Sequence, residues 1–210
     1  MLKPILASLT ALCLAACANL NNSTRLQGVV AVGGPLPHAQ VVVRDAKGTT
    51  VVANADARGH YSVDVSMLTA PLVLWASEAG NPNCRSNRLP RAICVTALLA
   101  SLRLGDNTAN LNPLTDLITS DVATALHVIG PQQLAEGDAA PIVAPSVYST
   151  ALGQLRAGFG AALTLAGVGN VDSFDPVRTA MHADGRGVDA VLSVIHHTRG
   201  YDNNSGESSA

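Results

Sequence analysis

The sequence predicts an α+β fold, with a β-rich N-terminal half followed by a helical C-terminal half. Residues 26–76 contain short apolar, often β-branched runs that are separated by turns rich in Gly and Pro. This pattern is typical of an antiparallel β-sandwich. From residue 113 onward, apolar residues recur at helical spacing instead. Hydrophobic residues make up 48% of the chain and aromatic residues only 3%, so we expect a core of Ala, Val, Leu and Ile.

The β-rich half predicts short strands that end at Gly- and Pro-containing turns such as Gly33-Gly34-Pro35. Residues 61–65 alternate apolar and polar side chains, as a half-buried strand does. Residues 71–76 are continuously apolar, which predicts a central strand with Trp75 in the core; the alternative is an exposed Trp75 that stacks on a sugar. The predicted strands are 26–32, 39–44, 49–54, 61–65 and 71–76, with one or two more between residues 93 and 104.

Three helices are predicted, at 113–129, 146–166 and 187–197. Asn112 suits the N-cap of the first, and Pro113 suits its first turn, where no amide donor is required. In the second helix, three glycines suggest close packing against another helix. In each predicted helix, apolar residues at helical spacing form one face that we expect to point inward. These residues are Leu114, Leu117, Ile118, Val122, Ala125, Leu126 and Ile129 in the first helix, Tyr148, Leu152, Leu155, Phe159, Leu163 and Ala166 in the second, and Val188, Val191, Leu192 and Ile195 in the third.

The first seventeen residues follow the order of an export signal. Lys3 provides the positive charge, and the apolar run Ile5–Ala16 is shorter than the ~20 residues of a membrane-spanning helix. The end of this run together with the next residue, Leu14-Ala15-Ala16-Cys17, resembles the lipobox of bacterial lipoproteins. The resemblance implies removal of residues 1–16, attachment of lipid to Cys17 and, because Ala18 is not Asp, sorting to an outer membrane. The alternative is an ordinary signal peptide that leaves Cys17 as a free thiol.

The expected organisation has five parts. Residues 1–16 form the signal peptide, 17–24 a flexible tether that reaches at most about 25 Å, 25–111 the β-sandwich, 112–199 the helical region, and 200–210 a disordered polar tail. After Lys3 is removed with the signal, the mature chain contains 12 basic and 15 acidic residues. Because charged residues are sparse and the net charge is negative, we expect no nucleic-acid partner.

Two cysteines remain for structural use after Cys13 is removed with the signal and Cys17 is lipidated. We expect Cys84 and Cys94 to form a disulfide, since exported proteins fold in an oxidising compartment such as the periplasm. Neither residue has a CxxC partner or a nearby His, which argues against zinc. The basic loop that they enclose, residues 85–91, is expected to be solvated; the alternative is an anion-binding loop.

The β-rich half contains a pattern of turn residues and an Asp-x-x-Gly-x-Tyr motif, at Gly28, Gly34-Pro35-Leu36, Ala39 and Asp56-Ala57-Arg58-Gly59-His60-Tyr61. This pattern resembles the carboxypeptidase regulatory-like domain. The resemblance covers about forty residues and implies a transthyretin-like sandwich of about seven strands, an accessory module without catalytic residues. The segments 110–118, 174–176 and 184–192 also resemble a helical region that follows such sandwiches in some bacterial lipoproteins, to which no activity is assigned.

Candidate catalytic and metal-binding residues are few. His196 and His197 point about 100° apart on a helix and cannot easily share a metal, so we expect them to interact with the helix dipole. His182, Asp184 and Asp189 have two interpretations, a general-base or metal cluster and a plain turn that leads into a helix. His38 and His60 lie in turn regions. The sequence contains no GxSxG, HExxH or P-loop motif, and we expect no catalytic, cofactor-binding or metal site.

These observations predict a non-catalytic lipoprotein of the cell envelope, held on the outer membrane by its N-terminal lipid. Its expected partner is an envelope protein or a glycan. The alternative is a hydrolase or a small-ligand-binding protein with a pocket between sandwich and helices, in which His182, Asp184 and Asp189 take part.

Overall fold

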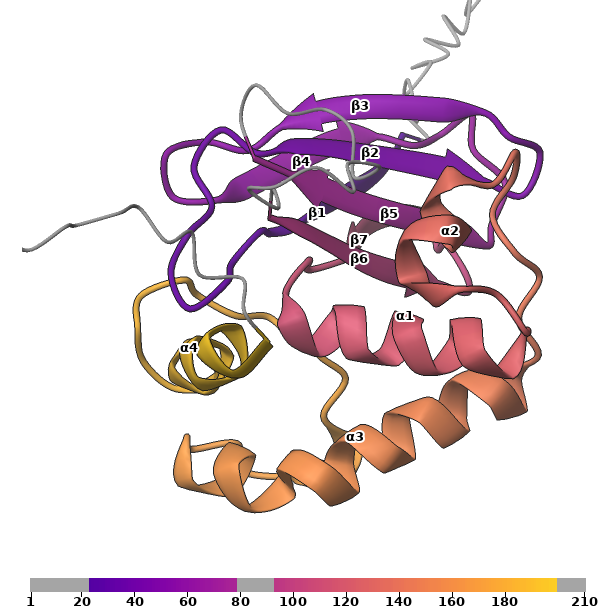
Figure 1. Ribbon diagram of the computed structural model, residues 1–210. Helices are drawn as coiled ribbons and strands as arrows, with labels where there is room; N and C mark the ends of the chain where they lie inside the picture. Colours follow the sequence, from indigo (N-terminus) through magenta and orange to yellow (C-terminus); the bar gives the residue numbers. More distant parts are fainter. Residues whose placement is uncertain (1–22, 79–92, 200–210) are drawn as a thin grey trace, which may run out of the picture.

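The computed structural model describes residues 23–78 and 93–199, with side chains for all of these except residues 136 and 196–199 (Figure 1). In these ranges, strands come first and helices follow, which confirms the predicted α+β class. The strands are β1 (Thr24–Val29), β2 (Gln40–Asp45), β3 (Thr50–Asn54), β4 (His60–Asp64), β5 (Leu72–Ser77), β6 (Cys94–Leu99) and β7 (Gly105–Thr108). The helices are α1 (Pro113–Ala125), α2 (Gly130–Glu136), α3 (Pro145–Leu165) and α4 (Val188–Arg199), with a 3-10 turn, η1 (Val171–Ser173).

The strands form two sheets. One has the order β4-β1-β7, and the other has the order β3-β2-β5-β6. Neighbouring strands are antiparallel except β1 and β7, which run parallel. In the four-stranded sheet, Val42 lies opposite Val52 on one side and Trp75 on the other. This register places all three side chains on the same face of the sheet.

Two apolar clusters give the molecule its layers. The first contains side chains from both sheets, including Leu26 of β1 and Leu74 of β5. The second joins the other face of the four-stranded sheet, with Val73 and Trp75, to the helices, which lie on one side of the sheets in Figure 1. Strand β5 is therefore buried on both faces, which explains its unbroken apolar sequence. Trp75 is only 9% exposed, as predicted for a core residue.

Helix α1 begins as its sequence predicts and closes one edge of the four-stranded sheet. The Asn112 side chain accepts hydrogen bonds from the amides of Leu114 and Thr115, and Pro113 occupies the first turn. Thr96 of the edge strand β6 donates to Asp116 through its amide (3.1 Å) and its hydroxyl (2.6 Å). The Thr115 hydroxyl donates to the Thr96 carbonyl (2.7 Å). The backbone groups of Thr96 at the free edge are thus satisfied by the helix.

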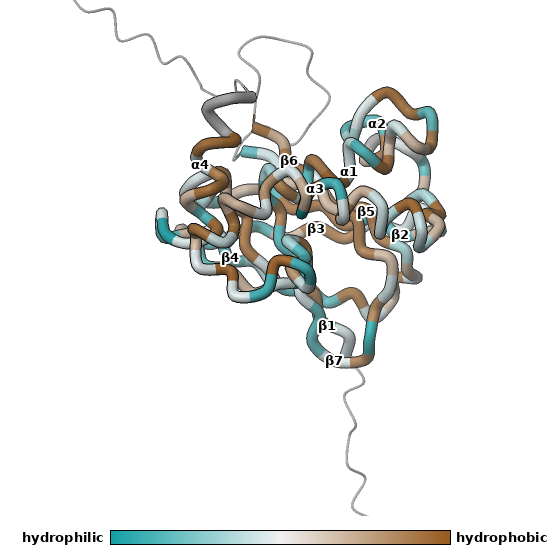
Figure 2. The backbone as a smooth tube through the Cα atoms, turned by 90° about the horizontal axis from the view of Figure 1, so that it is seen from below, coloured by the Kyte–Doolittle hydropathy of each residue, from teal (hydrophilic) through white to brown (hydrophobic). Residues whose placement is uncertain are grey.

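Helices α2 and α4 lie at opposite ends of the helical layer, as both views show (Figures 1 and 2). At one end, Arg44 of β2 donates to the carbonyls of Ala135 and Gly137 at the end of α2. Its guanidinium carbon lies 4.9 Å from the centre of the Trp75 ring, a cation–π distance.

At the other end, α4 packs against the loop that follows β1. Ser193 donates to the carbonyl of Gly33 (3.1 Å). A Cβ on Gly33 would lie 2.6 Å from the Ser193 Cα, and its φ is +95°, so this contact requires glycine.

Several predicted details were wrong. Thr24, assigned to the tether, is the first residue of β1, and the last strand, β7, begins after residue 104. The helix predicted to reach residue 129 ends at Ala125, a separate helix α2 follows, and Ile129 is 90% exposed. A Cβ added to Gly153 or Gly158 would have no described neighbour within 4 Å, so close packing does not explain these glycines. Residues 1–17, Cys84, the loop 85–91 and the tail 200–210 lie outside the described residues. None of the described helices is long and apolar enough to cross a membrane.

Candidate functional site

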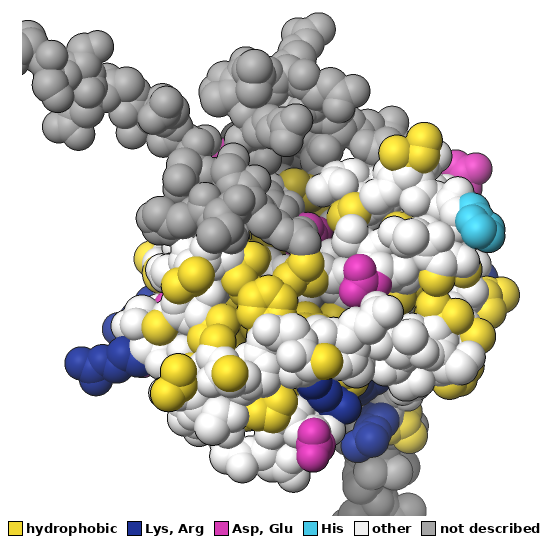
Figure 3. Space-filling model, turned by 60° about the horizontal axis from the view of Figure 1, so that its bottom comes forward, with side chains coloured by type: hydrophobic (Ala, Val, Ile, Leu, Met, Phe, Trp, Pro, Cys, Tyr) yellow, Lys and Arg dark blue, Asp and Glu magenta, His cyan; other side chains and the backbone are white. Residues whose placement is uncertain are grey.

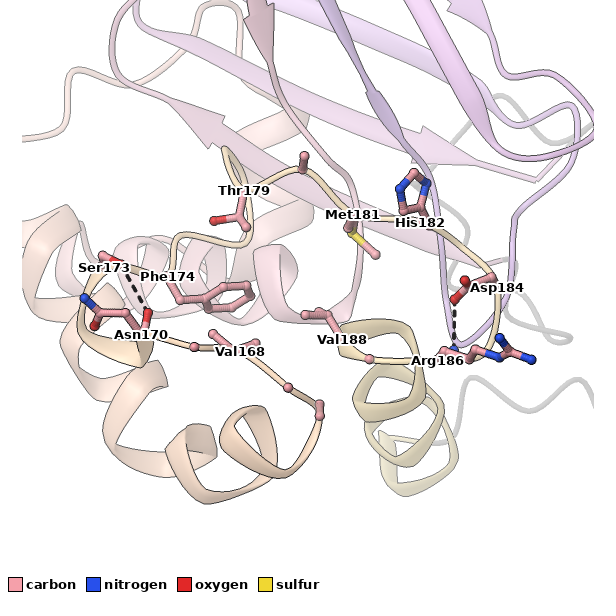
Figure 4. Close-up of a pocket in the computed structure, with 15 residues that line it drawn as sticks. Val168, Asn170, Ser173, Phe174, Thr179, Met181, His182, Asp184, Arg186 and Val188 are labelled. Carbon is pink, nitrogen blue, oxygen red and sulfur yellow. Dashed lines mark hydrogen bonds between the residues drawn. The ribbon is translucent and has the colours of Figure 1, made fainter.

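A solvent-open pocket of about 510 Å³ lies where the end of α3, the following loop and the start of α4 meet (Figure 4). Phe174 and Val168 contribute its apolar surface on the α3 side. His182, Asp184 and Arg186 lie at the other end of the pocket in Figure 4. The remaining lining residues come from 166–188, a single stretch of chain.

Buried asparagines fix this stretch to the sheets. The Asn110 side chain accepts from the Val29 amide (3.2 Å) and donates to the carbonyls of Pro176 (3.1 Å) and Thr179 (2.7 Å). The side-chain amide of Asn112 lies 3.4 Å from the Met181 sulfur. The floor of the pocket is therefore tied to β1 and to the start of α1.

Helix α3 fixes the same stretch from the other side. Arg156 donates to the Phe174 carbonyl (2.9 Å), and the Tyr148 hydroxyl donates to Asp175 (3.3 Å). Burial, and secondarily the charge of Asp175, raise the pKa of Tyr148, so the hydroxyl keeps its proton. Tyr148 thus acts as a hydrogen-bond donor that anchors the loop to α3.

Several polar side chains of the pocket hold its own loops in place. The Asn170 side chain accepts from the Asp172 amide, Ser173 donates to the Asn170 carbonyl, and the Asp184 side chain accepts from the Arg186 amide. The His182 side chain is exposed to solvent. The Asp184 bond confirms the turn that the sequence predicted before α4.

Asp189 does not join His182 and Asp184 in the pocket. Its side chain is fully buried in the first turn of α4, where Oδ2 accepts from the Gly185 amide (2.7 Å). Its Oδ1 has no hydrogen-bond partner among the described residues. Burial, and secondarily the charge of Asp184, raise the pKa of Asp189. The three residues of the predicted cluster therefore do not converge, and the described residues contain no group of three or more His, Cys, Asp or Glu suited to a metal.

A second hollow, about 500 Å³, is an apolar groove between α3 and α4. Figure 3 shows hydrophobic side chains gathered on this side of the molecule. Leu165 is 90% exposed and Val194 is 65% exposed. We call this surface the α3–α4 groove; it is lined by Phe159, Ala162, Leu165, Ala166, Gly187, Ala190, Val191, Val194 and Ile195.

The α3–α4 groove and the pocket share Ala166 and Gly187, so they form one continuous depression with an apolar half and a polar half. As predicted, Val191 is buried in the core, and Phe159 and Ala166 are partly buried against it. These three residues also form part of the groove lining. Leu165 and Val194 are apolar residues that lie outside the predicted inward faces of their helices. Their positions are the feature of the sequence that could have indicated a second apolar face.

The remaining candidates lie apart from the depression. His38 is exposed in the loop before β2, and His60 is exposed as the first residue of β4. Cys94 is buried at the start of β6, and its pairing with Cys84 stays a prediction because Cys84 is outside the described residues, as is Cys17. The side chains of His196 and His197 are also outside them.

No protein-family model matches the chain, and no curated protein is significantly similar to it in sequence. The functional proposal therefore rests on the N-terminal sequence and on the geometry of the depression.

Proposed function

We propose that the protein is a lipid-anchored lipoprotein of the cell envelope with a non-catalytic binding role, and that the α3–α4 groove receives an apolar segment of an envelope protein. The exposed groove is the observation that carries this binding role. Large exposed apolar surfaces in soluble bodies mark sites of association, and a groove between two helices suits an amphipathic helix.

The anchor is inferred from the sequence Leu14-Ala15-Ala16-Cys17, in which small residues precede a cysteine at the end of an apolar run. Cys17 would carry the lipid. β1 begins at Thr24, so a short tether would hold the folded body close to the outer membrane.

The fold supports a transthyretin-like sandwich as part of the proposal. Two sheets share one apolar cluster, and the residues of the resemblance have specific structural roles. Asp56 accepts from the amides of Arg58 and His60 (2.8 and 2.9 Å) and closes its own turn. A Cβ on Gly28 would overlap the Ala109 carbonyl oxygen. In the family that the sequence resembles, such a body is an accessory module, which agrees with a binding role.

A protein segment fits the α3–α4 groove better than a glycan does. The side chains that line it, from Phe159 to Ile195, carry no hydrogen-bonding group. Sugars need hydroxyl partners as well as an apolar platform, whereas an interface with a protein has an apolar centre and a polar rim. The adjoining pocket, with Asn170, Asp184 and Arg186, provides such a rim.

The binding role is tested by photo-crosslinking the lipidated protein in whole cells and identifying the captured protein by mass spectrometry. We then expect purified partner to bind the wild type, and Leu165→Glu and Val194→Glu to weaken this binding at least tenfold in calorimetric titration. Both side chains are exposed, so melting temperatures should stay unchanged. The control Val52→Lys, an exposed valine on β3, should bind as the wild type does. Equal binding by all variants would refute the role of the groove.

The anchor is tested separately with Cys17→Ser. We expect this variant to lose labelling by radioactive palmitate and to leave the membrane fraction, while the wild type is labelled and sediments with outer membranes. A wild-type chain that carries no lipid in intact-mass measurement would refute the anchor and leave the groove test unaffected.

The pocket supports one alternative, the binding of a small polar ligand, because His182 and Asp184 line the same open hollow. In that case His182→Ala should abolish binding or turnover in a ligand and hydrolase screen without lowering the melting temperature. An unchanged response would exclude a role for His182.

A further inference from the structure

Within the described residues, the four-stranded sheet has a free edge at β3. The Asp45 amide donates to the Thr49 carbonyl (3.0 Å), and the Ala55 amide donates to the Ala39 carbonyl (2.9 Å). Because hydrogen-bonding direction alternates along an antiparallel strand, these two bonds show which β3 residues face β2. The backbone groups of the intervening Thr50, Val52 and Asn54 therefore point away from the sheet, and all three residues are exposed.

Within the described residues, each of the other edge strands has a covered position or a charged side chain that β3 lacks. On β6, Thr96 is covered by Asp116 and Thr115 of α1. On β4, His60 bonds to the backbone and side chain of Asp56, and the strand ends in Asp64. On β7, Asp106 provides a charge. Strand β3 reads Thr-Val-Val-Ala-Asn and lacks the charges and prolines that usually prevent strands from pairing.

We infer that two copies of the protein associate through antiparallel pairing of β3 with β3, centred on Val52. With Val52 opposite itself, Thr50 lies opposite the partner's Asn54, and these are the residues whose backbone groups point outward. Two sheets of four strands then become one continuous sheet across a two-fold axis. Pairing of a strand with itself is the isologous contact that a two-fold dimer requires.

The side chains fit this register. Val52, 52% exposed, meets its own copy on the face where Val42 and Trp75 lie, and covers apolar surface that is otherwise in water. On the opposite face, Val51 meets the partner's Ala53. Beyond the strands, Gly48 falls opposite the partner's Asp56, so the exposed Lys47 lies beside a carboxylate of opposite charge. The centre of the contact is thus apolar, and its two ends are complementary in charge.

The association is tested by sedimentation of the full purified chain in mild detergent over a range of concentrations. We expect the wild type to be dimeric at micromolar concentration. Val52→Lys should be monomeric, with its dimer dissociation constant raised at least a hundredfold, because two lysines would meet on the axis. The matched control Val194→Lys, also at an exposed valine, should remain dimeric. Far-ultraviolet circular dichroism spectra equal to that of the wild type would show that each variant is folded, since the melting temperature itself depends on association.

A cross-link identifies the register. Cα atoms of a hydrogen-bonded antiparallel pair lie ~5.5 Å apart, which a disulfide spans. Val52→Cys should therefore form a covalent dimer on mild oxidation, with residue 52 joined to residue 52 in the peptide map, and Val194→Cys should not. A monomeric wild type, a dimer that survives Val52→Lys, or a map without the 52–52 link would each overturn the inference. These outcomes are independent of whether the α3–α4 groove binds a partner.

Discussion

Asn110 connects three segments that are far apart in the sequence. Its one side chain bonds to β1 at Val29 and to the loop carbonyls of Pro176 and Thr179, and it is almost completely buried. A buried polar group is stable only when its partners are present. The position of the candidate pocket relative to the sheets therefore depends on this residue.

Replacement of Asn110 by Ala should lower the free energy of unfolding by about 2–4 kcal/mol, because one buried amide and two carbonyls lose their partner. Denaturant unfolding at neutral pH measures the loss. The control Asn170→Ala removes a bond at the exposed turn η1 and should cost at most about 1 kcal/mol. Equal losses for the two variants would contradict the role assigned to Asn110.

Asp189 should make the protein less stable at neutral pH than at acid pH. Its pKa is raised in the folded state, first by burial, so the folded chain binds the proton more tightly than the unfolded chain does. The associated stability is present below the unfolded-state pKa and is lost as pH rises through the folded-state pKa.

Asp189→Asn should stabilise the fold at pH 7 by about 1 kcal/mol, since an amide can accept from Gly185 and carries no charge. The gain should shrink as the pH falls from the folded-state pKa towards the unfolded-state pKa, and it should be smallest below the latter, where the wild-type carboxyl is protonated in both states. Unfolding curves at several pH values test this, with the exposed Asp172→Asn as the control. A variant that is less stable at pH 7 would show that the charge is needed.

At the scale of elements, the sequence predicted well wherever one buried face determines the pattern. Helices α3 and α4 agree with the predicted ranges within two residues, and Asn112 and Pro113 marked the start of α1. Strand β7 was missed because Gly105–Thr108 contains no apolar side chain. It is a strand because β1 pairs with it in parallel. Such tertiary pairing leaves no periodic signal in the sequence.

The segment between β5 and β6 should be held by the predicted Cys84–Cys94 disulfide. Closing so short a loop should stabilise the fold by about 2–3 kcal/mol. Cys84→Ser should lower stability by this amount under oxidising conditions and have no further effect once reductant is added. Intact-mass measurement with and without alkylation reports the bond directly. A wild-type chain in which Cys84 and Cys94 are both alkylated without reduction would refute it.

At the scale of the whole molecule, the helices and the four-stranded sheet share one core, because Val73 and Trp75 pack in the same cluster as Leu114 and Leu152. We therefore expect a single cooperative unfolding transition. Trp75 fluorescence, which reports the sheet, and far-ultraviolet circular dichroism, which reports mainly the helices, should give the same midpoint. Two separated midpoints would show that the β-rich and helical parts unfold independently.

The depression on the surface was less predictable than the fold. His182 and Asp184 could be selected as chemically suited residues, but sequence spacing does not show that Asp189 turns inward while the other two line an open pocket. The α3–α4 groove was missed because it is completed by Leu165 and Val194, exposed residues outside the predicted inward faces, whereas Phe159 and Val191 pack on the core as predicted. A stripe shows that a residue is apolar on one face, and only the arrangement of helices shows whether that face is covered.

Helix α1 has a consequence for how large any assembly can become. Because Asp116 and Thr115 occupy the outward backbone groups of Thr96 in the middle of β6, another strand could pair along β6 only by displacing these side chains. Growth of a sheet into a fibre needs two receptive edges, and among the described strands of this sheet only β3 is unobstructed. Pairing of β3 with β3 occupies the receptive edge in both molecules. Extension of this sheet would therefore stop at two copies, and a high concentration of the protein would not by itself produce fibres.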